Sequence, residues 1–179
     1  MTVPEFLVWA AAQPQGRYEL VRGEVIAMAP ERARHNLVKF AVARALDDAI
    51  KRAGLPCTVF TDGMTVVIDK DTSREPDAAV QCGAATDLDS MILQAPLIVV
   101  EITSPSSERD DTVDKLVEYF SVASIKHYLI VNPAKKVVIH HARGDTAAIT
   151  TRILSAGEIE LVPPGMIVSV DALLPAMPA

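Results

Sequence analysis

The feature that most constrains this chain is an apolar run, residues 97–100, that is followed directly by a glutamate, Glu101. Four consecutive aliphatic residues are typical of a strand that is covered on both faces in the centre of a sheet. Strand alternation places Glu101 on the same face as Leu97, Val99 and Thr103, near the carboxyl end of the strand. A carboxylate buried there needs a cation, a hydrogen-bond donor or a proton. A structural ion pair and a functional site explain Glu101 about equally well.

A second carboxylate in an unusual setting is Asp77, which follows Pro76 at the head of another short strand, predicted over residues 76–81. Pro76 cannot donate a ladder hydrogen bond, so it favours the start or the edge of a strand. Carboxylates on adjacent strands can converge on one hard cation such as Mg²⁺, and such a cation can neutralise phosphate oxygens and activate water. An aspartate after a proline is also common in turns, so Asp77 alone does not decide between these interpretations.

The rest of the chain alternates between helical and strand-like patterns. Thr2 and Glu5 have the spacing of a capping box, and Gly54 ends a long helical segment. The order of elements predicts an α+β fold around one mixed sheet, in a single domain over residues 1–179. The predicted elements are an opening helix after Thr2, a hairpin over 17–29, helices over 31–53 and about 108–122, and strands over 57–60, 64–68, 76–81, 96–103, 126–131, 136–141, 148–154 and 166–170, with a loop over 69–73 and a helix cap at 104–107.

The helix predicted over about 108–122 carries one lysine, Lys115, away from its apolar side. Lys115 lies off the apolar stripe of this helix, on the same side as Asp111 one turn earlier. Spacing alone therefore predicts an ordinary surface ion pair between Asp111 and Lys115, and we expect Tyr119 to pack rather than to react. The stripe is predicted to consist of Val113, Leu116, Val117 and Phe120.

The charge balance restricts the functions that are open to the chain. There are 17 Lys and Arg against 23 Asp and Glu, a formal net charge of -6. This balance argues against a protein that coats nucleic acid or a membrane surface. It leaves a nuclease open, because positive charge can be local or supplied by a bound metal ion.

The cysteines and the N-terminus point to a reducing compartment. Cys57 and Cys82 form no CxxC pair, so we expect two reduced thiols rather than a zinc knuckle or a disulfide framework. The first residues lack the basic and apolar regions of a signal peptide, and no apolar run approaches the roughly 20 residues of a membrane helix. A cytoplasmic location is the expectation.

Other catalytic patterns are missing from the sequence. His140 and His141 are adjacent on a predicted strand, so they point to opposite faces and cannot chelate one ion together. There is no HExxH, P-loop, GxGxxG or GxSxG motif. Ser104 and Ser106 lie in a strand-to-helix turn, where serines commonly act as caps.

Several segments, in this order and spacing, together resemble one known family. They are Arg-Tyr-Glu-Leu-Val-Arg-Gly-Glu at 17–24, His35, Arg-Glu-Pro-Asp at 74–77, Val-Val-Glu-Ile-Thr-Ser-Pro-Ser-Ser at 99–107, residues 111–115, Tyr119, and the Pro-Gly turn at 164–165. The chain resembles the Uma-two-type family, whose members are described as candidate restriction endonucleases of the PD-(D/E)xK superfamily. The resemblance covers nearly the whole chain.

This resemblance implies a restriction-endonuclease-like αβββαβ core around a mixed β-sheet, with an N-terminal helix and hairpin and extra C-terminal strands. It implies that Asp77 and Glu101 are catalytic carboxylates that bind Mg²⁺ or Mn²⁺. The superfamily has a lysine two residues after the second carboxylate, where this chain has Thr103. Family members use a lysine of the next helix instead, which corresponds to Lys115, and that lysine could orient water or stabilise charge on the phosphate.

Two further residues become candidates through the same resemblance. Glu24 corresponds to the family's acidic residue after the hairpin glycine, although Arg22 replaces an acidic residue that the family often has nearby. His35 lies near the start of the long helix, from which it could approach a phosphate. A surface glutamate and a structural histidine are the simpler interpretations of these two positions.

Three hypotheses of function remain. The first is a metal-dependent endonuclease that hydrolyses phosphodiester bonds in DNA with Mg²⁺ or Mn²⁺, expected as a homodimer because closed two-fold dimers are the commonest oligomers. The second is a catalytically idle nuclease fold that acts as a binding module, which the acidic charge and Thr103 both favour. The third is purely structural, with Glu101 paired to Lys115 or an arginine in an oligomer core.

Overall fold

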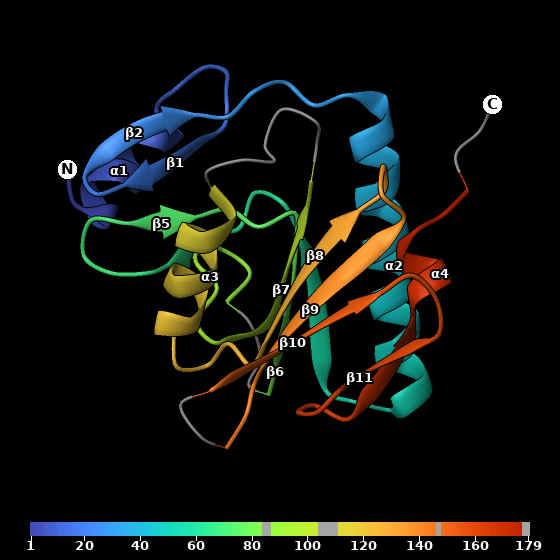
Figure 1. Ribbon diagram of the computed structural model, residues 1–179. Helices are drawn as coiled ribbons and strands as arrows, with labels where there is room; N and C mark the ends of the chain where they lie inside the picture. The colour runs from blue at the N-terminus through green and yellow to red at the C-terminus, as the bar shows by residue number, and fades with distance from the viewer. Residues whose placement is uncertain (84–86, 104–110, 146–147, 177–179) are drawn as a thin grey trace.

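The computed structural model describes residues 1–83, 87–103, 111–145 and 148–176. Its elements follow the predicted α+β order (Figure 1). They are α1 (Val3–Ala11), β1 (Tyr18–Val21), β2 (Glu24–Ala27), α2 (Ala33–Ala53), β3 (Cys57–Thr61), β4 (Val66–Val67), β5 (Ser73–Arg74), β6 (Ala78–Cys82), β7 (Pro96–Ile102), α3 (Asp111–Ser121), β8 (His127–Asn132), β9 (Val137–Arg143), β10 (Ile149–Leu154), β11 (Glu158–Leu161), β12 (Met166–Ser169) and α4 (Val170–Leu173).

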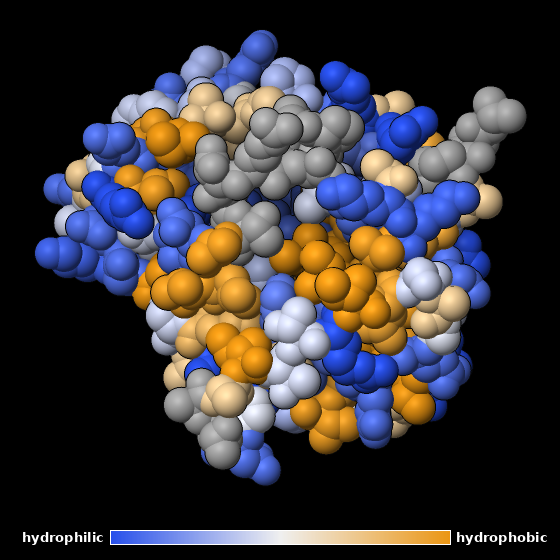
Figure 2. Space-filling model, in the orientation of Figure 1, coloured by the Kyte–Doolittle hydropathy of each residue, from blue (hydrophilic) through white to orange (hydrophobic). Residues whose placement is uncertain are grey.

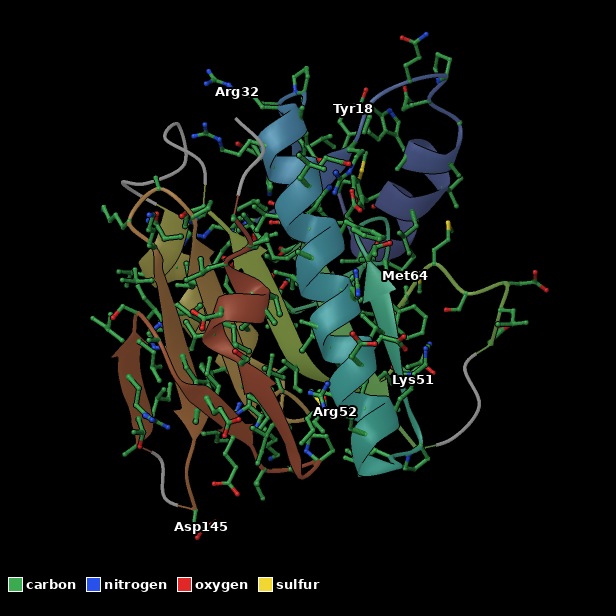
Figure 3. The ribbon with its side chains drawn as sticks, turned by 90° about the vertical axis from the view of Figure 1, so that its right-hand side faces the viewer. Tyr18, Arg32, Lys51, Arg52, Met64 and Asp145 are labelled. Atoms are coloured by element: carbon green, nitrogen blue, oxygen red, sulfur yellow. A yellow bond between two sulfur atoms is a disulfide. The ribbon has the colours of Figure 1, made fainter. Side chains whose placement is uncertain are left out.

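The central feature is a six-stranded sheet in the order β10-β9-β8-β7-β6-β3. Strands β7 and β8 are parallel, and the other neighbouring pairs are antiparallel. Helix α2 covers one face of this sheet and α3 packs on the opposite face (Figure 1). In Figure 3, α2 runs in front of the sheet from Arg32 at one end to Arg52 at the other. The order α2, β3, β6, β7, α3, β8 confirms the αβββαβ core and the mixed sheet that were predicted.

Strand β7 lies in the middle of the sheet because both of its faces are apolar. Ile98 and Val100 join the core beneath α2, whereas Val99 joins Tyr119 in the core beneath α3. All four of these residues are fully buried. The predicted strand alternation is therefore confirmed from Ile98 onward, and Glu101 follows Val99 onto the α3 side. Leu97 is the exception, because it lies where the register with β6 shifts and it packs against the core beneath α2.

The region before β6 differs from the prediction. Residues 57–60 and 64–68 were both expected to be strands, and β3 covers the first segment whereas β4 is confined to Val66–Val67. Strand β3 pairs with β6, and β4 pairs with β5 in a second sheet of order β2-β1-β5-β4. Residues 69–73 were expected to be a loop, but Ser73 already belongs to β5. Local alternation predicts that a segment is extended but does not identify its partner, so the division into two sheets could not be predicted.

The two cysteines also correct the sequence-based expectation, because Cys57 and Cys82 form a disulfide. Cys57 is the first residue of β3 and lies directly opposite Cys82, the last residue of β6. Opposed residues of antiparallel strands bring their Cβ atoms close together on one face of the sheet. The spacing of the two cysteines along the chain gives no sign of this pairing, which depends on how the strands are arranged.

The ends of the elements follow local chemistry. Glu5 accepts a hydrogen bond from the Thr2 backbone N–H at 2.7 Å, as the capping box predicted. Gly54 ends α2 in the left-handed conformation at φ 63°, which glycine adopts without steric cost. The cap predicted at residues 104–107 lies outside the described residues. Among the described helices, none is both long enough and apolar enough to cross a membrane.

The C-terminal part contains two elements that the sequence analysis missed. Strand β11 pairs with β12 as a hairpin, and α4 follows directly. Ile159 and Leu161 from β11 and Met166 from β12 are buried in the core that also contains α2. Two buried positions in a four-residue strand are too few to give a clear strand period, and this explains why β11 was overlooked.

Candidate active site

Asp77 lies at the start of β6, beside the carboxyl end of β7. Ala78 pairs with Val100, so the register places Asp77 opposite Glu101. The Asp77 Oδ2 atom accepts a hydrogen bond from the Ile102 backbone N–H at 2.7 Å. The Asp77 side chain thus takes the place of a backbone acceptor just where the β6 ladder begins, and the residue is only 6% exposed. Two carboxylates from adjacent strands therefore meet at this end of the sheet, as the sequence predicted.

Glu101 is held by two donors from α3. Its Oε1 atom accepts hydrogen bonds from the Tyr119 hydroxyl at 2.7 Å and from Lys115 Nζ at 3.1 Å. The pKa of Glu101 is raised to about 7, because burial and the negative charges of Asp77 and Glu19 outweigh Lys115 and the Tyr119 hydrogen bond, which lower it. The carboxylate is therefore short of positive charge even with its lysine in place.

Lys115 does not lie at the surface, where its spacing predicted it, and its pairing with Asp111 stays a prediction. Its side chain is 12% exposed and points at Glu101, and the side chain of Asp111 lies outside the described part of the chain. The predicted stripe was wrong in phase, because Val113 and Val117 are 70% and 66% exposed. The spacing of apolar residues could not predict which face of α3 points inward, because this face includes a polar residue, Lys115, that contacts the Glu101 carboxylate. The inward face of α3 consists of Lys115, Leu116, Tyr119 and Phe120.

A buried ion-pair network that the sequence analysis missed supports this arrangement. Arg74 on β5 bonds to Glu19 at 2.9 Å and to Glu118 of α3 at 2.7 Å. Glu19 also accepts the Glu75 backbone N–H at 3.1 Å and lies 3.9 Å from Lys115 Nζ. The network joins the N-terminal hairpin to α3 across the candidate site. The only sequence signal for Glu19 is a carboxylate flanked by apolar residues on a short strand.

Glu24 does not join this group in the structure. It is the first residue of β2, pairs with Val21 at the hairpin turn and is exposed. None of the ion pairs found among the described residues involves Glu24. The carboxylate that the hairpin contributes to the site region is Glu19, five residues earlier.

His35 reaches Asp77 from the first turn of α2. Its Nε2 atom lies 3.1 Å from Asp77 Oδ2, and this hydrogen bond is the main reason why the pKa of His35 is raised, against the effect of burial. Glu31, His35 and Asp77 each offer a ligand atom, and these atoms lie within 4.8 Å of one another. Imidazole and carboxylate donors together suit ions such as Mn²⁺ or Zn²⁺ better than Mg²⁺. Asp77 could therefore serve two cation positions, one toward Glu101 and one toward His35.

Glu31 is already neutralised in part by protein cations. It pairs with Lys39, and with Arg17 at 2.6 Å. Arg17 also pairs with Asp62 at 2.5 Å and with Glu75 at 2.6 Å. The carboxylates in this chain of contacts outnumber the two permanent cations, Arg17 and Lys39, so the His35 side of the site also carries surplus negative charge.

A hollow of about 300 Å³ lies next to this network, on the α1 side. Phe6 and Leu7 of α1 line it, together with Tyr18, Arg17 and Glu75. Its lining does not include Asp77, Glu101 or Lys115. The hollow is therefore a neighbour of the candidate site and not the site itself.

The arrangement has the chemistry of a divalent-cation site. Asp77 Oδ1 and Glu101 Oε2 have no hydrogen-bond partner among the described residues. Two buried carboxylates that repel each other and keep free oxygens are a donor set that hard cations prefer. Lys115 and His35 lie on either side of the pair, where each can donate to an anion or a water molecule.

Comparison with known proteins agrees with this geometry. A family model named Uma2 and described as "Putative restriction endonuclease" matches residues 3–171. An uncharacterized protein from Synechocystis sp. is 21% identical over 171 residues, which cover 94% of this chain and 88% of that protein. The crystal structure of "a putative nuclease belonging to DUF820" from Anabaena variabilis has a TM-score of 0.75 at 16% identity, with 97% of each chain covered. At that identity the likeness concerns the fold, whereas the family match spans nearly the whole sequence, and the chain belongs to the Uma2 family.

Proposed function

We propose that this protein is a metal-dependent endonuclease that hydrolyses phosphodiester bonds in DNA. The observation that carries the proposal is the meeting of Asp77 and Glu101, where burial and mutual repulsion raise the pKa of Glu101 to about 7. Membership of a family described as restriction endonucleases supports the same reaction class. A divalent ion, Mg²⁺ or Mn²⁺, would supply charge neutralisation for the phosphate and a more acidic water.

The residues of this chain have separable tasks in the proposed reaction. Asp77 and Glu101 would hold the cation through Asp77 Oδ1 and Glu101 Oε2, which have no donor among the described residues. Lys115 lies 3.1 Å from Glu101 Oε1 and orients the attacking water or stabilises charge on the phosphate. Lys115 would thus replace the superfamily lysine, because the position of that lysine is occupied here by Thr103, which has no cationic group. His35 donates to Asp77 and fixes the orientation of that carboxylate.

A second candidate function is a nuclease fold that binds a partner without turnover. Two observations favour it. Lys115 Nζ lies between two carboxylates, 3.1 Å from Glu101 and 3.9 Å from Glu19, which limits its freedom to act on a substrate. The chain as a whole carries a net charge of -6, which weakens attraction to DNA.

Cleavage of labelled single- and double-stranded DNA with Mn²⁺ or Mg²⁺ tests the first candidate. We expect the wild type to cut, and Asp77→Asn, Glu101→Gln and Lys115→Met to be inactive. The matched control is Glu24→Gln, which changes the same chemical group at an exposed position of the hairpin and should cut like the wild type. Inactivity of the wild type with both ions would favour the binding module, and equal cleavage by wild type and Glu101→Gln would show the assigned site to be wrong.

Thermal unfolding with added Mn²⁺ locates the cation independently of turnover, because a ligand that binds only the folded state raises the midpoint. Loss of the Mn²⁺ shift in Glu101→Gln would assign the ion to the Asp77–Glu101 position. Loss of the shift in His35→Ala and Glu31→Gln, with Glu101→Gln unaffected, would assign it to the His35 side. No shift in the wild type at millimolar Mn²⁺ would reject a metal site.

A further inference from the structure

Strand β10 is the outermost strand of the six-stranded sheet. It pairs with β9 over all six of its residues, Ile149–Leu154. Among the described residues, no strand pairs with its other edge. Backbone groups on such an edge form a template for a further strand.

The hydrogen-bond pattern identifies which groups face outward. The Gly144 N–H donates to Ala148 O at 3.4 Å. Because antiparallel pairs alternate between bonded and non-bonded positions, Thr150, Arg152 and Leu154 bond to β9. Ile149, Thr151 and Ile153 consequently point their N–H and C=O groups away from the sheet.

The hydrogen bonds between β9 and β8 lead to the same assignment of outward-facing residues on β10. The Arg143 N–H donates to Lys126 O at 2.9 Å, which assigns Arg143, His141 and Ile139 to the β8 side of β9. The alternate residues of β9 must then bond to β10, and they face Thr150, Arg152 and Leu154. The free edge of β10 is therefore formed by Ile149, Thr151 and Ile153.

The edge lacks the usual features that prevent pairing. Natural edge strands carry proline, lysine or a bulge, or they are very short. Strand β10 contains no proline, has an uninterrupted register with β9, and carries one charged residue, Arg152. Ile153 is 70% exposed and Ile149 is 38% exposed. Figure 2 shows apolar residues gathered over this part of the sheet and over α3, where Val113 and Val117 are also exposed.

We propose that the free edge of β10 binds β10 of a second copy of this chain, in antiparallel orientation, about a two-fold axis at Thr151. In this register Thr151 lies opposite its own equivalent, and Ile149 lies opposite the partner's Ile153. All outward N–H and C=O groups of the three edge residues are then paired. Arg152 lies opposite the partner's Thr150, so no like charges oppose each other.

Neighbouring registers are less favourable, and this selects the axis at Thr151. An outward-facing residue must pair with another outward-facing residue, so the register can change only in steps that move the axis by one residue. An axis at Arg152 places this arginine opposite its own equivalent, which is repulsive. An axis at Thr150 leaves Ile153 beyond the paired segment. The strand thus complements itself in one register, as a two-fold interface requires, and this favours a second copy over an unrelated extended peptide.

Cysteine cross-linking in the full chain tests the register. Cys57 and Cys82 are bonded to each other and there is no other cysteine, so an introduced thiol is the only one available. In the proposed dimer, the two Cα atoms at position 151 are about 5.5 Å apart, within the range of about 4.4–6.8 Å that a disulfide spans. We expect Thr151→Cys to form a covalent dimer under mild oxidation.

Thr150→Cys is the matched control, because it changes the same residue type one position earlier on the same exposed strand. The two copies of position 150 are offset by two residues along the strands, which separates their Cα atoms by about 8 Å and exceeds disulfide reach. We expect little cross-linking of this variant. Equal cross-linking of Thr150→Cys and Thr151→Cys would overturn the proposed register.

Sedimentation of the wild type and of Thr151→Pro tests the interface itself. Proline removes the outward N–H of Thr151 without removing a backbone hydrogen bond to β9, although it also removes the side-chain bond between Thr151 Oγ1 and His141 Nδ1. We expect a folded monomer from this variant and a dimer from the wild type at about 100 μM. A wild type that is monomeric at this concentration overturns the proposal. A wild-type dimer that Thr151→Pro leaves intact and Thr151→Cys does not cross-link overturns it as well, because another surface would then form the dimer.

Discussion

The Tyr119 hydroxyl donates a 2.7 Å hydrogen bond to Glu101 Oε1, the same carboxylate oxygen that accepts a bond from Lys115. Both donors come from α3, so the position of this helix decides how Glu101 is oriented. The other oxygen, Oε2, has no donor among the described residues. Even with two donors the pKa of Glu101 is raised to about 7, because burial and the nearby charges of Asp77 and Glu19 outweigh them.

This raised pKa predicts a pH-dependent effect of Glu101→Gln on stability. A carboxyl group whose folded pKa is above its unfolded value stabilises the fold when protonated, and this contribution is lost as pH rises from about 4.5 through 7. In the presence of a chelator, the free energy of unfolding of Glu101→Gln should therefore improve relative to the wild type between pH 5 and pH 8. Urea titrations at the two pH values measure the change.

The control for this prediction is Glu24→Gln, which alters an exposed glutamate. Its difference from the wild type should be the same at pH 5 and pH 8. If Glu101→Gln and the wild type also keep a constant difference, Glu101 ionises normally and the site is not short of positive charge.

Replacing Arg74 should lower the free energy of unfolding strongly, because Arg74 is 5% exposed and pairs with two carboxylates from different elements. Arg74→Met leaves Glu19 and Glu118 without this partner in a buried setting, where breaking an ion pair costs about 3–5 kcal/mol. Denaturant unfolding should show a loss of this size.

Arg22→Met is the matched control for Arg74→Met. The Arg22 side chain is 77% exposed and lies 3.9 Å from Asp114, and exposed pairs of this kind contribute about 0–1 kcal/mol. Equal losses in the two variants would mean that burial of the Arg74 network does not determine its contribution.

Much of the candidate site could be predicted from the sequence, because its two carboxylates lie at the ends of strands that have clear sequence patterns. Glu101 after four aliphatic residues and Asp77 after Pro76 both indicated carboxylates at strand ends, and the register of β6 and β7 places them opposite each other. The family resemblance added Lys115, which lies 3.1 Å from Glu101. Their roles in catalysis and metal binding stay a proposal.

The features that could not be predicted from the sequence depend on contacts between distant segments. Glu19 and Arg74 are 55 positions apart and meet only because β1 pairs with β5. The inward face of α3 was predicted one step out of phase, because the buried Glu101 attracts Lys115 and its neighbours inward while Val113 stays exposed. Hydrophobic periodicity counts apolar residues and has no means to anticipate a buried polar partner.

The Cys57–Cys82 disulfide predicts a loss of stability on reduction. It closes a segment with a sequence separation of 25, and restricting the unfolded chain over a loop of this size is worth about 3 kcal/mol. Unfolding of the wild type with and without a reducing agent should differ by roughly this amount. Cys57→Ser combined with Cys82→Ser should be insensitive to the reducing agent, and the same sensitivity in that double variant would assign the effect to something other than the disulfide.

A pair of buried histidines gives a further prediction from its hydrogen bonds. His127 Nε2 lies 2.9 Å from Pro163 O, so this nitrogen carries the proton and donates it. His127 Nδ1 must then accept from His140 Nε2 at 2.9 Å. The remaining nitrogen, His140 Nδ1, is buried without a partner among the described residues. Both rings are therefore neutral in the folded protein.

Burial, together with the neighbouring His127, Arg152 and His141, lowers the pKa of His140 to about 4. A histidine with a lowered folded pKa contributes stability above its unfolded pKa of about 6.5, and this contribution is lost as pH falls through 4. His140→Gln keeps a donor for His127 but does not titrate, so its free energy of unfolding should improve relative to the wild type between pH 6.5 and pH 4.5. The pKa of His35 is raised instead, so its contribution is complete below about pH 6.5 and is lost as pH rises through the folded pKa. His35→Gln should therefore lose stability relative to the wild type as pH falls from 8.5 to 6.5. If urea titrations give the same sign for both variants, the two rings do not differ in the way that their hydrogen bonds require.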